Sequence, residues 1–391
     1  MINEEMYALG AAPNKIREIF AYGLERKAQI GDDKVFDLSI GNPSVPSPAI
    51  VDETIERLVR EGQGTMHAYT MSPGLVEARE AIAQNLNRRY GTHYTAGNLY
   101  FTAGASAAIC IAIKAVVLPG EELIAITPYF PEYKTWASNA GAITVEVPAR
   151  ASDFMLDIDA IEAAITPKTA AIIINTPNNP VGSVYSDENL TQLADLLRAK
   201  SAEYGHTIYL ISDEPYRELV YDGLTPAWIP SLYDATFVCY SWSKSFSLPG
   251  ERIGYLLVPS EMPDFDRVYK AVCGAGRSLG YICDSILFQL AVAECIDAPI
   301  DVAPYDRNRK LLYDGLTSIG YNVIYPQGAF YMMAALPVDN ADTFQKWLLT
   351  DFDDNGDTVM FAPGEGFYAT PGKGLNEIRI AYVLKQKDLE R

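Results

Sequence analysis

Seven short apolar runs recur along the chain, and helical stretches separate them. The runs are "NLYFT" (98–102), "ELIAITP" (122–128), "AITVEVP" (142–148), "AAIIINTP" (170–177), "TIYLISDEP" (207–215), "ATFVCYS" (235–241) and "RIGYLLVP" (252–259). They are almost continuously apolar, which is typical of parallel strands buried on both faces. Strands that alternate with helices in this way predict a mostly parallel sheet covered by helices on both sides.

The pattern changes from about residue 300 onward. A helix is expected over 303–319, followed by strand-like runs such as "YNVIYPQGAFYMMAAL" and by a helix over 342–350. This mixture predicts a smaller α+β domain. The length supports the division, since 391 residues are more than one hydrophobic core usually serves.

Composition narrows the class of protein. The formal net charge is −19, and so acidic a surface repels nucleic acid and anionic lipid, so we expect neither as a partner. The longest apolar stretch, 107–118, is broken by Lys114 and is too short to span a membrane. Without an apolar signal core at the N-terminus, the protein is expected to be cytoplasmic. Five cysteines lack CxxC spacing and three histidines lack ligand spacing, so no metal site is expected.

Polar residues follow several of the predicted strands directly. Asp213 ends "TIYLIS", Lys244 follows "ATFVCYS", Asn179 follows "AAIIINTP" and Tyr129 follows "ELIAITP". In an open α/β sheet, ligands bind in the crevice beyond the carboxyl ends of the strands. We therefore expect these side chains to converge on one site.

Lys244 and Asp213 each have an ordinary and a functional interpretation. Lys244 either extends to solvent or is a partly desolvated amine with a lowered pKa that attacks an aldehyde. Asp213 either caps a helix or is the counter-ion of a protonated heterocyclic nitrogen. Tyr216, three residues further on, is either a core residue or a phenol that contacts the same ligand.

Three other segments carry similar alternatives. The loop "NTPNNPVG" (175–182) either only caps a strand or aims the Asn179 amide into the crevice. The helix start after Gly104 reflects tight packing or binds phosphate through free N–H groups. Arg379, in "NEIRIAYV", is either a surface residue or binds a substrate carboxylate through two parallel hydrogen bonds.

Five segments, in this order along the chain, resemble the class I/II aminotransferases of the aspartate aminotransferase family, which are fold-type I pyridoxal-phosphate enzymes. The segments are "YTMSPGLVEARE" (69–80), "NTPNNPVG" (175–182), "SDEPY" (212–216), "SWSKSFSLPGERIGY" (241–255) and "IRIAY" (378–382). Val181 stands where the family has threonine and Ala78 where leucine is common. The resemblance covers nearly the whole chain.

The resemblance implies a role for each candidate residue. Lys244 would form a Schiff base with pyridoxal 5′-phosphate, and Asp213 and Tyr216 would complete the catalytic group, with Asp213 on the pyridine nitrogen and Tyr216 and Asn179 on the ring oxygen. Tyr129 would stack on the ring. The phosphate would contact a set of residues at two strand ends and on the neighbouring subunit: Gly104, Ala105, Ser106, Ser241, Ser243, Arg252 and, from the partner of a homodimer, Tyr69.

Substrate recognition is implied in the same way. Arg379 would hold the α-carboxylate of the substrate, with Asn179 beside it and Gly41 closing over it. Arg277, in "GAGRSLGYICDS", is either a helix or interface arginine or the residue that pairs with a distal carboxylate in the partner subunit's pocket. The substrates would be an L-amino acid (aspartate, aromatic or similar) and a 2-oxo acid.

The implied fold is an α/β fold-type I pyridoxal-phosphate transferase with a mostly parallel seven-stranded sheet. Residues 46–290 would form the large cofactor-binding domain, and residues 1–45 and 291–391 the small domain. Two other functions remain open from the sequence. One is a carbon–sulfur β-lyase with the same cofactor and fold. The other is a non-catalytic, cofactor-sensing regulator, which would need an attached DNA-binding module, and we expect none in this strongly acidic chain.

Overall fold

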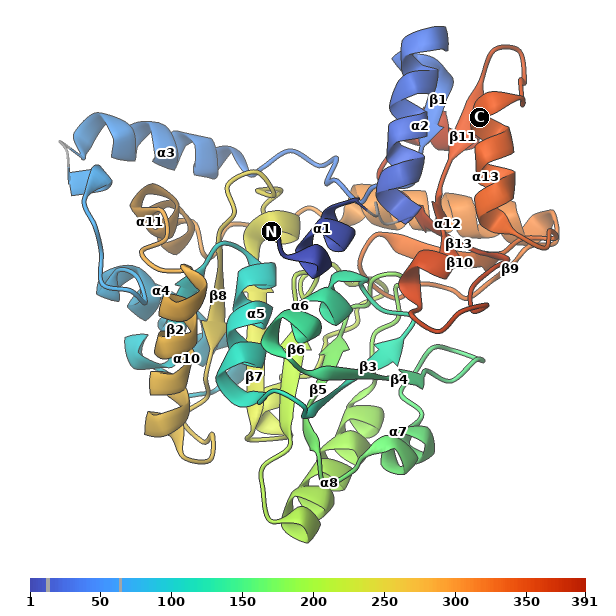
Figure 1. The fold of residues 1–391 in the computed structure, drawn as a ribbon. Helices are drawn as coiled ribbons and strands as arrows, with labels where there is room; N and C mark the ends of the chain where they lie inside the picture. Colours follow the sequence, from blue (N-terminus) through green and yellow to red (C-terminus); the bar gives the residue numbers. More distant parts are fainter. Residues whose placement is uncertain (12–14, 63–64) are drawn as a thin grey trace.

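A seven-stranded sheet forms the centre of the molecule (Figure 1). The computed structural model describes residues 1–11, 15–62 and 65–391. The strand order is β2-β8-β7-β6-β5-β3-β4, and every neighbouring pair from β7 to β4 is parallel, whereas β8 runs antiparallel to both of its neighbours. The strands are β2 (Leu99–Thr102), β3 (Glu122–Thr127), β4 (Ile143–Pro148), β5 (Thr169–Asn175), β6 (Tyr209–Asp213), β7 (Thr236–Ser241) and β8 (Gly254–Leu257).

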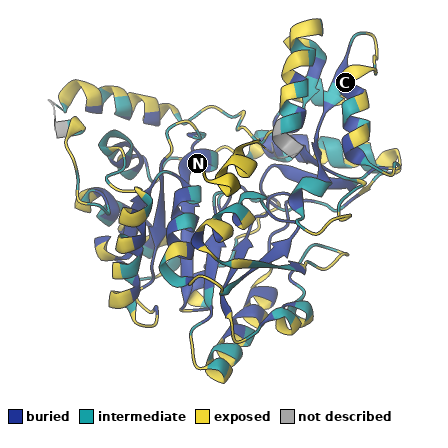
Figure 2. Ribbon diagram, in the orientation of Figure 1, coloured by how far each residue is buried: buried dark blue, intermediate teal, exposed yellow. Residues whose placement is uncertain are grey.

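Each of the seven apolar runs is a strand of this sheet, so the predicted α/β fold with a mostly parallel seven-stranded sheet is confirmed. The reason is visible in the alternation along β7. Phe237 and Cys239 belong to one buried cluster, with α5 and α8, while Val238 and Tyr240 belong to another, with α4. Both faces of the strand are buried (Figure 2), so both sets of positions are apolar.

Helices cover the sheet and also form the outer parts of the molecule. They are α1 (Glu4–Ala11), α2 (Lys15–Ile30), α3 (Ala49–Glu61), α4 (Val76–Tyr90), α5 (Ala105–Val116), α6 (Glu132–Ala140), α7 (Ile158–Ala164), α8 (Asp187–Tyr204), α9 (Trp242–Ser245), α10 (Phe265–Leu279), α11 (Ile286–Glu294), α12 (Ala303–Ser318), α13 (Ala341–Thr350) and α14 (Gln386–Glu390). Short 3-10 helices are η1 (Asp32–Lys34), η2 (Thr65–His67), η3 (Ala96–Asn98), η4 (Ile229–Ser231) and η5 (Gly364–Phe367). None of the helices in the described part of the chain could cross a membrane.

A second, smaller unit combines the two ends of the chain. Its antiparallel sheet has the order β12-β13-β10-β9, and β1 pairs in parallel with β11. These strands are β1 (Val35–Asp37), β9 (Asn322–Val323), β10 (Tyr331–Ala335), β11 (Thr358–Met360), β12 (Ala362–Pro363) and β13 (Glu377–Ala381). Helix α2 packs against α13 beside them (Figure 1). The boundary predicted at residues 290 and 291 falls within α11, which packs against α3 and α4, and the division into domains stays a prediction.

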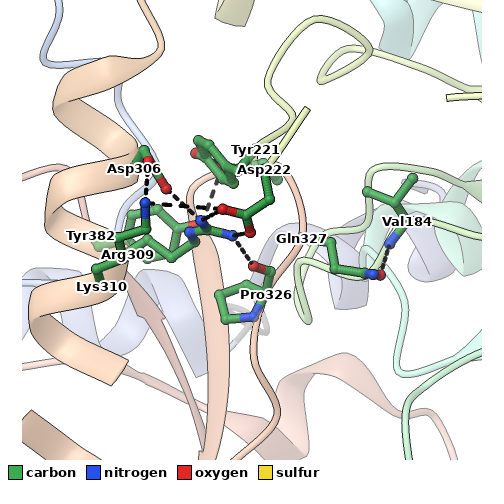
Figure 3. Close-up of polar contacts among 10 residues, drawn as sticks. Val184, Tyr221, Asp222, Asp306, Arg309, Lys310, Pro326, Gln327 and Tyr382 are labelled. Atoms are coloured by element: carbon green, nitrogen blue, oxygen red, sulfur yellow. Dashed lines mark hydrogen bonds and ion pairs between the residues drawn. The ribbon is translucent and has the colours of Figure 1, made fainter. Parts of the chain in front are cut away.

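Arg309 of α12 ties the two units together (Figure 3). Its guanidinium is fully buried and forms ion pairs with Asp222, at 2.9 Å, and with Asp306. It also donates to the carbonyl oxygen of Pro326 at 2.8 Å, and its Cζ lies 4.4 Å from the centroid of the Tyr221 ring. The charge is therefore paired and covered where the 221–222 segment meets the smaller unit.

Candidate active site

A cavity of about 380 Å³ lies where the carboxyl ends of β5, β6 and β7 meet the small sheet. Its wall contains eleven residues that the sequence singles out: Gly41, Ala105, Ser106, Asn179, Asp213, Tyr216, Ser241, Ser243, Lys244, Arg252 and Arg379. These residues come from segments spread over most of the chain. The expected convergence beyond the strand ends is therefore present in the structure.

Lys244 projects into the cavity from the short helix α9. Ser241 caps the N-terminus of this helix, and its hydroxyl oxygen accepts a hydrogen bond of 3.1 Å from the backbone N–H of Ser243. The Lys244 Nζ donates to the carbonyl oxygen of Gly41 at 2.7 Å. Burial, and then the positive charges of Arg379 and Arg252, lower the pKa of Lys244 to about 8. The interpretation of Lys244 as a lysine extended into solvent is therefore wrong, and the lowered pKa suits an amine with a nucleophilic role.

Asp213 ends β6 and is buried in the cavity wall. Its Oδ2 accepts a hydrogen bond of 2.5 Å from the Tyr133 hydroxyl, while its Oδ1 is buried without a partner. Burial raises the pKa of Asp213 to about 7, although the Tyr133 hydrogen bond acts in the opposite direction. A turn, not a helix, follows Asp213, so the interpretation as a helix cap is wrong.

The Asn175 side chain fixes the loop that follows β5. The Asn175 side chain donates from Nδ2 to the Asp213 carbonyl oxygen at 2.7 Å, and its Oδ1 accepts from the Asn179 backbone N–H at 2.6 Å. Asn175 thereby places the Asn179 side chain against the cavity. Because these contacts satisfy buried backbone groups, the loop has a defined geometry.

The start of α5 and Arg252 form one corner of the cavity wall. Gly104 precedes the helix with φ of 81°, and a Cβ there would lie 2.9 Å from the Arg252 Nη2. Arg252 Nη2 donates to the Ala103 carbonyl oxygen at 3.2 Å. The hydroxyls of Ser241 and Ser243 lie 2.6 Å apart in the same wall. Free N–H groups of Ala105 and Ser106, a guanidinium and two hydroxyls together suit a phosphate.

Arg379 points inward from β13 and is buried. Its Nη1 donates to Asn179 Oδ1 at 2.9 Å, and its Nη2 donates to the Ser39 carbonyl oxygen. Burial lowers the pKa of Arg379. The ring of Tyr331 lies 4.5 Å from its Cζ, and the Tyr331 hydroxyl lies 3.2 Å from that of Tyr216. The interpretation of Arg379 as a surface residue is therefore wrong.

Tyr129 does not lie in the place expected from the sequence. It is absent from the cavity wall, where the next residue, Phe130, lies instead. The Tyr129 ring instead stacks on that of Tyr133, at a centroid distance of 6.0 Å. Successive side chains after β3 point in different directions, so Phe130 rather than Tyr129 has the position from which a ring could stack on a ligand.

Three further candidates also lie outside the wall of this cavity. Gly104 acts through the close approach of Arg252 described above. Tyr69 is 96% exposed. Arg277 is exposed in the last turn of α10. Since the roles expected of Tyr69 and Arg277 are in a partner subunit's site, these positions leave both roles as predictions.

Several wall residues were not predicted from the sequence. They are Ser39, Ile40, Ile109, Phe130, Pro131, Glu132, Trp136, Asn175, Pro215, Pro249 and Tyr331. Asn175 ends an apolar strand as Asp213 does, and this signal was available. Tyr331 offered none, because only the packing of the small sheet against the large one brings it to the cavity. In the described ranges, no group of three or more His, Cys, Asp or Glu side chains is arranged to hold a metal ion.

Comparisons with known proteins agree with this geometry. The family model for aminotransferase class I and II matches residues 33–391. The aspartate/prephenate aminotransferase of Thermus thermophilus is 31% identical over 97% of this chain and 94% of its own length. Aromatic-amino-acid aminotransferase 2 of Thermococcus litoralis is 28% identical over 97% and 93%. A crystal structure of an amino transferase from Eubacterium rectale has a TM-score of 0.93 and 46% identity, covering 100% of this chain and 96% of that one. The chain belongs to the class I and II aminotransferase family and is an aminotransferase.

Proposed function

We propose that this enzyme moves an amino group between an L-amino acid and a 2-oxo acid with pyridoxal 5′-phosphate bound in the cavity beside Lys244. The observation that carries the proposal is the buried, unpartnered Oδ1 of Asp213. A carboxylate oxygen in such a place costs free energy unless a ligand brings it a donor. A protonated pyridine nitrogen is a donor of the right charge. The corner at Ala105, Ser106 and Arg252 suits the phosphate.

The residues of the cavity then have different roles in the reaction. When bound, the cofactor supplies an electron sink that stabilises negative charge at the substrate Cα. Asp213 holds the pyridine nitrogen in its protonated form. Lys244 takes the proton from the substrate Cα and later returns it, and its lowered pKa keeps a useful fraction of the amine neutral near pH 7. The Tyr216 hydroxyl and the Asn179 amide orient the ring oxygen.

Arg379 is proposed to hold the α-carboxylate of the substrate. Its guanidinium is already oriented by Asn179 and the Ser39 carbonyl oxygen, and a charge-assisted two-pronged contact suits a carboxylate. Gly41 lies beside it, where a Cβ would fall 1.7 Å from the Tyr331 hydroxyl. For the side chain we propose acidic or aromatic amino acids, because the relatives named above act on aspartate and prephenate or on aromatic amino acids.

We also propose that the enzyme is a homodimer with shared active sites. Tyr69 is almost fully exposed within one chain, and Met71, two residues further on, is exposed as well, so this segment presents apolar surface that a second subunit would cover. In the proposed dimer it contacts the phosphate in the neighbouring subunit. Sedimentation velocity at assay concentration tests this point, and a catalytically competent monomer would contradict it.

The test of the reaction itself uses purified protein loaded with pyridoxal 5′-phosphate. Borohydride should fix the cofactor covalently on Lys244, and peptide mapping should find the adduct there. A panel of amino acids with 2-oxoglutarate, pyruvate and oxaloacetate should give amino transfer that Lys244→Ala abolishes. An adduct on another lysine, such as Lys114, would overturn the assignment of the whole site.

A further inference from the structure

Glu146, on the edge strand β4, binds a loop of the smaller unit through several hydrogen bonds. Its Oε1 accepts from the Ala369 backbone N–H at 2.5 Å. Its Oε2 accepts from the Thr370 backbone N–H at 2.8 Å and from the Thr370 hydroxyl. Hydrogen bonds to an ionised acceptor are stronger than neutral ones, so this carboxylate holds the loop firmly to the large sheet.

The same loop is attached to the large sheet at a second point. Phe367, the last residue of η5, accepts a hydrogen bond of 3.1 Å at its carbonyl oxygen from the Tyr129 backbone N–H. The segment 367–370 is thus fixed both before and after Tyr368. Its position relative to the cavity is set by Tyr129 and Glu146, which belong to the large sheet and the loop that follows β3.

Phe367 connects this attachment to Arg379. Its ring is buried, and its centroid lies 5.0 Å from the Arg379 Cζ. The Tyr331 ring lies at 4.5 Å from the same atom. The Nε of Arg379 is buried without a partner, so aromatic packing contributes to holding that part of the guanidinium in place. A displaced Phe367 would allow Arg379 to move.

We infer that Glu146 is a positioning residue for substrate binding, which fixes segment 367–370 and thereby holds the Arg379 guanidinium in the orientation that receives the substrate carboxylate. This inference rests on the proposed role of Arg379. Glu146 itself is outside the cavity wall and acts only through Phe367. It should therefore affect how well both the amino acid and the 2-oxo acid bind, and leave the Lys244 and Asp213 side of the site unchanged.

The test replaces Glu146 by Gln, which keeps the size but offers one acceptor oxygen where two are used. Hydrogen exchange should speed up at the Ala369 and Thr370 amides. KM for both the amino acid and the 2-oxo acid should rise about tenfold, as expected when a charged hydrogen bond worth about 1.5 kcal/mol is lost. The kcat and the affinity of cofactor-free protein for pyridoxal 5′-phosphate should stay within about twofold. Phe367→Leu, which leaves the Glu146 contacts in place, should raise KM in the same way.

Glu122→Gln provides a matched control. The Glu122 carboxylate likewise accepts hydrogen bonds, from the hydroxyls of Thr166 at 2.6 Å and Thr169 at 3.1 Å, but Glu122 begins β3, far from the cavity end of the sheet. It should leave KM and the exchange of 367–370 unchanged.

Arg379→Leu distinguishes a failure of this inference from a failure of the proposed function. If Arg379→Leu raises KM but Glu146→Gln does not, the positioning role is overturned and the role of Arg379 stands. If neither substitution raises KM, both assignments are overturned. Unchanged exchange at Ala369 and Thr370 in Glu146→Gln would overturn the attachment itself.

Discussion

The Tyr133 hydroxyl donates a hydrogen bond of 2.5 Å to one oxygen of Asp213 and leaves the other oxygen, Oδ1, buried without a partner. Tyr133 is fixed in turn by the parallel ring of Tyr129. The carboxylate is therefore held in one orientation before any ligand arrives. In the free enzyme this arrangement is unfavourable, and it becomes favourable only when a cationic N–H reaches Oδ1.

Asp213→Asn should stabilise the cofactor-free protein and slow the reaction of the loaded enzyme. The folded-state pKa of about 7 lies above the ordinary value of 3.8, so the folded state binds the proton more tightly. The contribution of Asp213 to the free energy of unfolding is therefore largest below pH 4. It is lost as the pH rises through 7, and the loss amounts to about 4 kcal/mol at 1.36 kcal/mol per pKa unit. Thermal unfolding of the unsubstituted protein and of the variant should be measured from pH 4 to 8. The difference between their melting temperatures should widen as the pH rises. Turnover of the loaded variant should fall by roughly two or more orders of magnitude, or at least about 3 kcal/mol of barrier, and near-normal turnover would contradict the role.

Tyr133→Phe should weaken cofactor binding without removing the site. Loss of the hydrogen bond raises the pKa of Asp213 further, because that bond lowers it. Less of the carboxylate is then ionised near pH 7, and affinity for pyridoxal 5′-phosphate should fall about tenfold, for a bond to a charged group worth about 1.5 kcal/mol. Fluorescence titration with pyridoxal 5′-phosphate between pH 6 and 9 measures this affinity, and the loss of affinity should be smallest at high pH. An equal loss at every pH would indicate a packing defect instead.

Covalent attachment at Lys244 should depend on pH with a midpoint near 8. Burial first, and then Arg379 and Arg252, lower the pKa of this amine from 10.5 to about 8, so the reactive neutral amine increases as the pH rises through that value. Stopped-flow absorbance of cofactor-free protein mixed with pyridoxal 5′-phosphate measures the rate. Arg379→Met removes one positive charge and should move the midpoint upward; a midpoint that stays in place would show that Arg379 does not influence the amine.

Arg277→Leu addresses the choice of substrate. If Arg277 pairs with a distal carboxylate in the partner's pocket, the variant should lose activity on aspartate and keep it on phenylalanine. Such a contact is worth about 1.5–3 kcal/mol, or roughly ten- to a hundredfold in kcat/KM. The comparison of kcat/KM for the two amino acids decides the matter, since an equal loss on both, or no loss, leaves Arg277 as a structural residue of α10.

Arg309→Leu should destabilise the protein by about 2–3 kcal/mol, the order expected for hydrogen bonds that involve charged groups. The guanidinium is fully buried, and it pairs with Asp222 and Asp306. Urea unfolding followed by circular dichroism measures the change. Lys310→Leu is a suitable control, because Lys310 pairs with the same two acids from the partly exposed side, and it should cost less than about 1 kcal/mol.

The sequence predicts the large sheet well because its strands are buried on both faces. A run such as "AAIII" has to be apolar at every position, and the residue that follows such a run lies at the ligand-binding edge. The same reasoning could not distinguish Tyr129 from Phe130, since the direction of each side chain beyond β3 depends on the path of the backbone. Nor could it determine that Arg379 faces inward, because the residue pattern along a single strand of a small sheet does not show which face is buried. Tyr133 and Glu146 carried no sequence signal, as their partners Asp213 and Thr370 are far away in the chain.

The parallel pairing of β1 with β11 sets an order on how the chain folds during synthesis. Val35 pairs with Thr358, so the N-terminal strand has no partner until most of the polypeptide has left the ribosome. At about 5–20 residues per second, the intervening stretch of roughly 300 residues takes about 15–60 s to synthesise. During that time the strands of the large sheet emerge and can pair, while Ile19 and Val35, which are buried in the finished protein, stay exposed to water. The first segment to be made is thus among the last to find its place in the fold.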